Sequence, residues 1–258
     1  MKIATFNANS IRARLPIIGE WLEREHPDIL CLQETKVQDK DFPQDMFTQK
    51  GYQVVINGQK SYNGVAIASR LPMGDITYSL YGSKDGEEAR FISARVKDLE
   101  IINVYVPQGY AVGTEKFRYK LLWLRDLLEY VKGAYLPDDM LFLAGDFNVA
   151  LEPTDVYDPE KFDGEVCFHP EERAILREYL GWGFVDLFRV YEKGGGKYTF
   201  WDYRIPNAVK RNMGWRLDYI FVTEPLAKRS TRAWVDLEPR LKERPSDHTF
   251  LVAEFNNL

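Results

Sequence analysis

Apolar residues fall into short runs along the chain, and these runs predict a protein rich in β-strands. Within each run, β-branched and aromatic residues alternate with polar ones or follow one another without interruption, over about four to eight residues. The runs span residues 2–7, 28–34, 52–57, 64–69, 91–96, 99–106, 140–146, 217–222 and 249–255. We therefore expect strands from one end of the chain to the other.

Helical periodicity lies between some of these runs. Over residues 114–132 the apolar side chains recur three or four residues apart and form one stripe, with Thr114 as the expected N-cap. A second helix is expected over residues 15–25, with Pro16 in its first turn. A third is expected to begin at Pro170 and to end before Gly181, because glycine commonly follows the last helical turn.

The order of these elements predicts the architecture. Helices alternate with strands in the first half, but strand follows strand from residue 52 to residue 106, which indicates two mixed β-sheets packed face to face with helices outside. A length of 258 residues fits one large domain or two small ones, and no Pro/Gly/Ser-rich linker divides the chain. We expect one domain over residues 1–258, with Gly194–Gly196 at a loop tip.

Composition restricts the class of protein. Apolar residues make up 45 % of the chain, as in globular proteins, and the sequence has no run of about 18 apolar residues that could cross a membrane. The first ten residues alternate like a strand, unlike a secretory signal. Cys31 and Cys167 form no ligand spacing. We expect a cytoplasmic protein with no membrane partner.

Charge is distributed unevenly. The net charge of −5 does not by itself favour a nucleic-acid partner, but residues 189–248 contain 13 Lys or Arg against 8 Asp or Glu, a local net charge of +5. Because phosphate neutralisation needs only a local patch, this region could supply a basic surface for nucleic acid. Ordinary solvated charge explains the same count equally well.

Polar residues at the ends of apolar runs are the strongest indication of a functional site. A carboxylate or amide at the end of a buried strand is costly to desolvate unless it is paired or bound to a metal, and sites collect at strand ends in layered α/β folds. The residues in such positions are Asn7, Glu34, Tyr105, Asp146, Asn148, Asp218, Asp247 and His248. Each alone could be a turn or capping residue, but the whole set favours a site.

The chemistry of this set favours a hard metal ion. Carboxylate and amide oxygens suit Mg²⁺ or Mn²⁺, whereas zinc is disfavoured because the chain has three histidines and no paired His or Cys spacing. His26 and His169 border predicted helices and are expected to be local structure. His248 follows a carboxylate before a core strand and can stabilise or protonate developing charge, with Asp218 as a plausible partner.

Eight short motifs are spread along the chain between residues 3 and 249. They read NANSIRAR, LQETK, NVYVPQG, AGDFN, DLFR, YTFWDYR, GWRLDY and RPSDH. In identity and order they resemble the exonuclease III and abasic-site (AP) endonuclease family. The resemblance implies a four-layer α/β sandwich and a Mg²⁺-dependent phosphodiesterase that cuts duplex DNA on the 5′ side of an abasic site, leaving a 3′-hydroxyl. It also implies 3′→5′ exonuclease and 3′-end-cleaning activity.

The resemblance also implies a metal-binding role for five positions. Glu34 would be the principal ligand. Asn7 and Asp247 would complete or support the metal shell, together with Asp146 and Asn148.

The same resemblance implies the catalytic roles. Asp146 would orient or deprotonate the attacking water, and Asn148 would help to hold that water and the phosphate. His248, held by Asp218, would bind a phosphate oxygen, which Tyr105 would also contact.

Recognition of the damaged DNA is implied at further positions. Phe200, Trp215 and Leu217 match the wall of the family's pocket for the abasic sugar, whereas Trp201 fits the pocket or the core equally well. Candidate contacts to the DNA backbone or bases are Arg12, Lys36, Gln108, Arg204, Asn207, Lys210, Arg211 and Arg216. The loop 204–213 varies in such enzymes, and Ser10 stands where some members carry glycine.

Relatives with other activities remain as alternatives. Secreted deoxyribonucleases, sphingomyelinases and inositol-phosphate phosphatases of the same superfamily favour a second histidine on the central strand, where this chain has Tyr105. A non-catalytic DNA-binding relative should lack one of the principal polar residues, and all are present. An enzyme that is mainly a 3′→5′ exodeoxyribonuclease stays open, because these activities share one site. We expect a monomer acting on double-stranded DNA.

Overall fold

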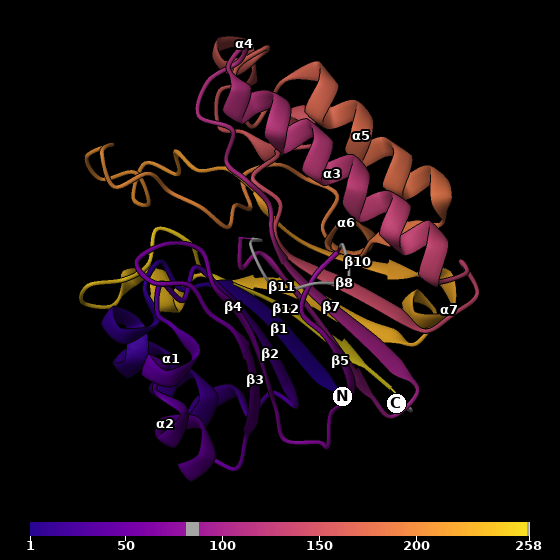
Figure 1. Ribbon diagram of the computed structural model, residues 1–258. Helices are drawn as coiled ribbons and strands as arrows, with labels where there is room; N and C mark the ends of the chain where they lie inside the picture. Colours follow the sequence, from indigo (N-terminus) through magenta and orange to yellow (C-terminus); the bar gives the residue numbers. More distant parts are fainter. Residues whose placement is uncertain (81–87, 257) are drawn as a thin grey trace.

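The computed structural model describes residues 1–80, 88–256 and 258, and its described part contains two six-stranded β-sheets that face each other (Figure 1). The first sheet has the order β11-β12-β1-β2-β4-β3 and the second β5-β6-β7-β8-β10-β9. The strands are β1 (Lys2–Asn7), β2 (Ile29–Gln33), β3 (Gln53–Asn57), β4 (Val65–Ser69), β5 (Gly74–Thr77), β6 (Phe91–Val96), β7 (Leu99–Tyr105), β8 (Leu141–Asp146), β9 (Phe184–Asp186), β10 (Asp218–Thr223), β11 (Ser230–Asp236) and β12 (Phe250–Phe255).

Helices cover the outer face of each sheet and complete four layers. They are α1 (Ile11–Glu25), α2 (Gln44–Gln49), α3 (Glu115–Ala134), α4 (Pro159–Phe162), α5 (Pro170–Trp182), α6 (Leu187–Tyr191) and α7 (Glu224–Ala227). Helices α1 and α2 lie on the first sheet, and α3 and α5 on the second (Figure 1). One apolar cluster fills the space between the sheets, and one lies under each helical layer. The sandwich predicted from the sequence is confirmed.

Each sheet is built around one parallel pair of strands joined by a helix. In the first sheet β1 and β2 are parallel and α1 connects them. In the second, β7 and β8 are parallel and α3 connects them. The strands pairing with them on either side are antiparallel. The carboxyl ends of the two parallel pairs lie at one end of the sandwich, and the chain termini lie at the other (Figure 1).

All nine strands predicted from the sequence are present, with ends shifted by two residues at most. The three strands that were not predicted are β5, β9 and β11, each at the edge of a sheet. An edge strand pairs on one side only and is partly exposed, so its side chains need not show the apolar pattern of a central strand. The β11 sequence STRAWVD, with four polar residues, illustrates this.

The predicted helices are present, with two corrections. Thr114 caps α3, because its side chain accepts a hydrogen bond from the backbone N–H of Phe117. Helix α1 begins at Ile11, so Pro16 lies inside it and not in its first turn. Helix α5 continues through the exposed Gly181 to Trp182, and Gly183, with φ of 134°, follows its end. Gly181 therefore does not mark the end of the helix. Glycine permits a left-handed turn, but it can also occupy an exposed position inside a helix at some cost in stability.

A buried polar bridge joins the two sheets just behind the strand ends. Gln33 Nε2 donates to Asn103 Oδ1 (2.7 Å), and Asn103 Nδ2 donates to the carbonyls of Leu32 and Ala66 (2.9 Å each). These buried hydrogen bonds fix β2 against β7 immediately before the residues that leave these strands. Among the described residues, no helix has the length and hydropathy needed to span a membrane.

Candidate active site

Pairing within the second sheet places three of the predicted polar residues side by side. Asp146 ends β8, where it lies opposite Tyr105 of β7 on one side and Asp218 of β10 on the other. Gly145, just before it, has φ of 142°, and a Cβ added there would lie 1.9 Å from the carbonyl oxygen of Val104. Glycine is therefore required at this position, because only its bare backbone allows β8 to approach β7 so closely.

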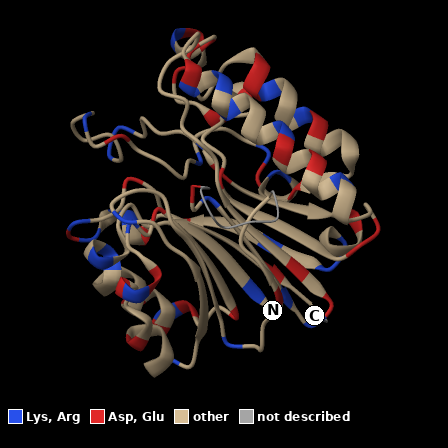
Figure 2. Cartoon of the chain, in the orientation of Figure 1, with Lys and Arg blue, Asp and Glu red and all other residues tan. Residues whose placement is uncertain are grey.

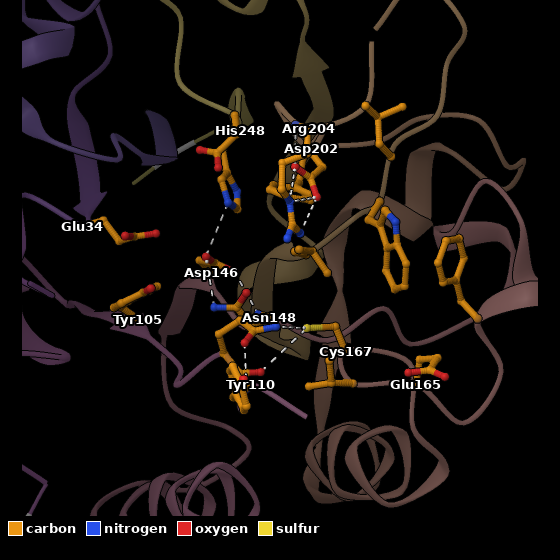
Figure 3. Close-up of a pocket in the computed structure, with 18 of the residues that line it drawn as sticks. Glu34, Tyr105, Tyr110, Asp146, Asn148, Glu165, Cys167, Asp202, Arg204 and His248 are labelled. Carbon is orange, nitrogen blue, oxygen red and sulfur yellow. Dashed lines mark hydrogen bonds and ion pairs between the residues drawn. The ribbon is translucent and has the colours of Figure 1, made fainter. Parts of the chain in front are cut away.

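The first sheet brings its own polar residues to the same end. Asn7 ends β1, and Glu34 follows β2. Asp247 and His248 precede β12, which is antiparallel to β1. Glu34, Asp146, Asn148, Tyr105 and His248 face one cavity, as Figure 3 shows. The structure thus brings together the residues predicted from the strand ends.

Asn7 links the carboxylates contributed by the two sheets. Its Nδ2 donates to Glu34 Oε1 and to Asp146 Oδ2, both at 2.8 Å. Its Oδ1 accepts the backbone N–H of Asn9 at 2.9 Å, so Asn7 presents its NH₂ group to the carboxylates. In this arrangement Asn7 contacts the acidic residues as a donor, and it holds the two sheets in register at the site.

His248 is buried between two carboxylates. Its Nδ1 lies 2.7 Å from Asp218 Oδ2, and its Nε2 lies 3.6 Å from Asp146 Oδ2. Burial opposes the charged imidazolium, but the carboxylates of Asp218 and Asp146 outweigh it and raise the pKa of His248 above its usual range. Burial also raises the pKa of Asp146, and Asp218 and Glu34 add to the rise while His248 opposes it. A proton can therefore be exchanged at this site near neutral pH.

Asn148 is held against Asp146 by its own backbone and side chain. Its backbone N–H donates to Asp146 Oδ1 (2.8 Å), and its Nδ2 lies 3.3 Å from Asp146 Oδ2 and 3.0 Å from the carbonyl oxygen of Val106. The residue has φ of 51°, in the left-handed region. Asn9, Glu34 and Lys36 are left-handed as well. Non-glycine residues in this conformation cost energy and cluster at functional sites.

Further contacts surround Glu34 and Tyr105. Lys36 Nζ lies 2.9 Å from Glu34 Oε2, so the predicted DNA contact Lys36 is engaged with a carboxylate. Asn9 Nδ2 donates to Asp247 Oδ1 at 3.0 Å. The Arg90 guanidinium, which the sequence did not single out, lies 4.9 Å from the Tyr105 ring centroid. Burial and the charges of Glu34 and Asp146 raise the pKa of Tyr105, so its phenol remains protonated.

The acidic side chains can hold a metal ion. Asp146, Asp218 and His248 each offer a ligand atom, and these atoms lie within 4.8 Å of one another. Glu34 and Asp247, lining the same cavity, add carboxylate oxygens of the kind that hard divalent cations prefer. The donor set therefore fits a metal-dependent reaction.

The cavity continues from these residues into an apolar pocket, with a total volume of about 680 Å³. The predicted wall residues Phe200, Trp215 and Leu217 all line it, and Trp201 belongs to a separate buried cluster. Phe162 of α4 also lines it, with its ring 4.8 Å from that of Trp215. The four-residue helix α4 shows no periodicity that could have indicated this contribution.

Six of the eight predicted DNA contacts are exposed, and two of these line the cavity. Gln108 and Arg204 line it, and the Arg204 side chain is 89 % exposed although it is paired with Asp202. The loop 204–213 projects from the body beside the strand ends and carries basic residues (Figures 1 and 2). The remaining exposed candidates are Arg12, Asn207, Lys210 and Arg211.

The prediction that Arg216 contacts DNA is wrong. Its side chain is fully buried and forms two hydrogen bonds to Asp155, at 2.7 and 2.9 Å. The guanidinium also lies 2.8 Å from Asp186 and 4.2 Å from the Tyr219 ring centroid. Arginine has five donors and a flat apolar face, so it can be buried where carboxylates satisfy it.

The basic excess of residues 189–248 does not form one surface. Arg229 lies beside Met1 and Leu258, at the end of the molecule that carries the termini. Arg189 is bound to the buried Asp155. Of the basic residues in 189–248, Arg204 lines the cavity, and further exposed cations lie in the 204–213 loop.

Comparison with known proteins adds a family and close structural relatives. Residues 4–248 match the endonuclease/exonuclease/phosphatase family. Exodeoxyribonuclease III of Haemophilus influenzae is 32 % identical over 267 residues, which cover 99 % of this chain and 100 % of that protein. The structure of an AP endonuclease from Archaeoglobus fulgidus has a TM-score of 0.96 and 45 % identity, with full coverage of both chains. The structure of the 3′ phosphatase NExo from Neisseria, bound to a product DNA hairpin, has a TM-score of 0.95 and 39 % identity, again with full coverage.

Proposed function

Because this chain belongs to the exonuclease III and AP endonuclease branch of the endonuclease/exonuclease/phosphatase family, and is therefore a nuclease, we propose that it incises duplex DNA on the 5′ side of abasic sites. One observation carries the proposal. The phosphate-handling residues and the apolar pocket of Phe200, Trp215 and Leu217 open into one cavity. A flipped-out sugar without a base can occupy such a pocket while its phosphate lies at the strand ends.

The buried residues of the second sheet would carry out the hydrolysis. Asp146, with its raised pKa, orients the attacking water and accepts its proton, and Asn148 holds both in place. The protonated His248 and the phenol of Tyr105 donate to the phosphate oxygens, where negative charge develops. The new bond joins the water oxygen to phosphorus, and the bond between phosphorus and the upstream O3′ breaks. The leaving O3′ takes up a proton from solvent and Asp146 returns the proton it accepted to solvent, so a 3′-hydroxyl and a 5′-phosphate result.

Mg²⁺ is the proposed cofactor, with Mn²⁺ as a substitute. Glu34 would be its principal ligand, with Asp247 and Asp146 as further oxygen donors and Asn7 holding Glu34 in place. When bound, the ion supplies positive charge against the phosphate and the leaving oxygen. The preference for Mg²⁺ follows from the carboxylate donors and the absence of paired histidines in the sequence.

The test uses a 5′-labelled duplex with one tetrahydrofuran abasic analogue. In Mg²⁺ we expect a single cut on the 5′ side of the analogue, giving a product that a polymerase can extend, and in excess EDTA we expect no cut. Asp146→Asn and His248→Ala should each lower kcat by about 10³-fold, whereas the exposed Asp138→Asn should match the unmodified enzyme. Incision that persists in EDTA, or full activity in Asp146→Asn, would contradict the mechanism.

Processing of 3′ ends is the second candidate. It is favoured by the 39 % identity to NExo of Neisseria, which is described both as a 3′ phosphatase and as a 3′-5′ exonuclease. The same assay includes an undamaged duplex and a duplex with a 3′-phosphate. If end removal on these substrates outruns incision at the abasic analogue, 3′-end processing is the main activity and the abasic assignment fails.

A further inference from the structure

Lys120 is a fully buried ammonium behind the active site. It lies on α3, on the face that packs against the second sheet and α5, among residues that are otherwise apolar. Lysine is almost never fully buried unless its charge is paired. Its burial therefore indicates that the ammonium has partners in the interior of the protein.

The ammonium of Lys120 is directed at segments that line the cavity. Its Nζ donates to the backbone carbonyl of Asn148 at 2.6 Å and to that of Gln108 at 3.2 Å. The same nitrogen forms an ion pair with Glu172 in the first turn of α5, and it lies 3.7 Å from Cys167 Sγ. One cation thus contacts the chain after β7, the chain after β8 and the segment that precedes α5.

Glu172 extends this connection to the far side of the cavity. Its carboxylate accepts the backbone N–H groups of Cys167 (3.2 Å) and His169 (3.0 Å). Gly109 shows how closely the segments approach, because a Cβ added there would lie 3.0 Å from Lys120 Cδ, at a φ of 94°. The glycine of the PQG motif is thus explained by the buried lysine stem beside it.

We propose that Lys120 is a positioning residue for the phosphodiester chemistry, acting through Asn148; this inference rests on the proposed function. Asn148 has a left-handed backbone and bonds Asp146 through both its amide groups. A charge-assisted hydrogen bond to its carbonyl is stronger than a neutral one and fixes the plane of the following peptide. A buried ion pair can often be replaced by apolar side chains without loss of stability. The specific contribution of the Lys120–Glu172 pair is therefore to fix the positions of the Asn148 and Gln108 carbonyls.

The test separates positioning from stability with three variants. Lys120→Met leaves Glu172 unpaired and should lower both Tm and kcat. Lys120→Met/Glu172→Gln removes both charges while the glutamine carbonyl can still accept a backbone N–H at the start of α5, so it should recover most of Tm but not kcat, since the Asn148 and Gln108 carbonyls still lack their donor. Leu124→Ala, one turn further along the same buried face, is the matched control: it should lower Tm and leave kcat unchanged.

Steady-state kinetics on the abasic duplex give the first readout. For the double variant we expect kcat to fall about 10- to 100-fold, as for a displaced catalytic group, with KM for DNA changed by less than about threefold. In an Asn148→Ala background the same pair of substitutions should have no further effect on kcat, because Lys120 acts through that residue. Full kcat in the double variant, or an undiminished further decrease in the Asn148→Ala background, overturns the proposal.

Hydrogen exchange gives a readout that does not depend on the substrate. Removal of the Lys120 ammonium should speed exchange of the Asn148 amide, which bonds Asp146, in both Lys120 variants but not in Leu124→Ala. If the unmodified enzyme fails to cut the abasic duplex, the proposed function fails while this measurement still decides the role of Lys120. Unchanged Asn148 exchange in the double variant overturns that role.

Discussion

Asp218 and His248 are coupled by a 2.7 Å contact in which both side chains are buried. Burial alone would lower the pKa of His248, and the carboxylate of Asp218 makes the largest contribution to raising it. Asp218→Asn should therefore lower the pKa of His248, so that less imidazolium is present at neutral pH. We expect kcat on the abasic duplex to fall by about 10²-fold or more, since the imidazole also loses the partner that fixes its tautomer.

The measurement is an NMR titration of the histidine rings in EDTA. The chain has three histidines, so the ring signals of His26 and His169 serve as internal references. An unchanged midpoint for His248 in Asp218→Asn would show that Asp218 does not set its charge.

At the scale of single residues, the sequence predicted which polar residues meet at the strand ends but not what surrounds them. A polar residue at the end of an apolar run is visible without a structure, and Asn7, Asp146 and Asp218 were found in this way. Whether a basic residue is buried is not visible. The sequence therefore predicts Arg216 as a surface charge, and Lys120 interrupts the apolar stripe of its helix without any motif that marks it as buried. Long-range contacts decide both cases, and these follow from the packing of distant elements.

The parallel pairs β1–β2 and β7–β8 are the elements that assemble the site. Each pair delivers its carboxyl-end residues to one edge of a sheet, and the Gln33–Asn103 bridge holds the two edges together. Central strands and long helices were predictable because burial imposes periodicity on them. The edge strands β5, β9 and β11, helix α4 and the start of α1 could not be predicted, because short or exposed elements depend on tertiary contacts.

Arg216 lies between the pocket-wall residues Trp215 and Leu217, just before β10. Its buried ion pair with Asp155 anchors this stretch of the chain. Burial alone would raise the pKa of Asp155, but the guanidiniums of Arg216 and Arg189 hold it below its usual range. A depressed folded-state pKa contributes stability above the unfolded value of about 3.9, and this contribution is lost as the pH falls through the folded value. Asp155→Asn should cost about 3 kcal/mol at pH 7, because it removes the carboxylate that Arg216 and Arg189 share and leaves the buried Arg216 with Asp186 alone.

Denaturant unfolding at several pH values checks this prediction. The difference in free energy of unfolding between the unmodified enzyme and Asp155→Asn should be largest at neutral pH and should shrink below about pH 4. The exposed Asp138→Asn is the control and should show a small difference throughout. A difference that grows on acidification would mean that Asp155 is not held in its charged form.

The whole molecule is acidic, with a net charge of −5, yet its proposed substrate is a polyanion. We therefore expect the approach to DNA to depend on exposed basic residues, among them Lys210 and Arg211 of the 204–213 loop. We expect KM for duplex DNA to rise steeply with salt while kcat changes little. Lys210→Ala/Arg211→Ala should raise KM at low salt and reduce the slope of log KM against log salt by about 2, because each of the two cations would neutralise one phosphate.

Lys228→Ala is the matched control for this charge effect. Lys228 is an exposed cation that directly follows α7, and it is paired with Glu224 of that helix. Helix α7 lies on the side of the molecule away from the 204–213 loop (Figure 1). Its removal should leave the salt slope unchanged. If Lys210→Ala/Arg211→Ala and Lys228→Ala have the same slope as the unmodified enzyme, the 204–213 loop does not contact the DNA backbone.

Phe200 joins the pocket wall to the catalytic histidine through the main chain. Its backbone exchanges two hydrogen bonds with Trp215, both at 2.9 Å, and it forms an isolated bridge to His248. An insertion or deletion at Phe200 would move the pocket wall and the imidazole together, whereas a change at the exposed residues 210–212 of the 204–213 loop would touch neither. Evolution or engineering of lesion preference therefore has room in that loop, while the Phe200 segment must be inherited intact.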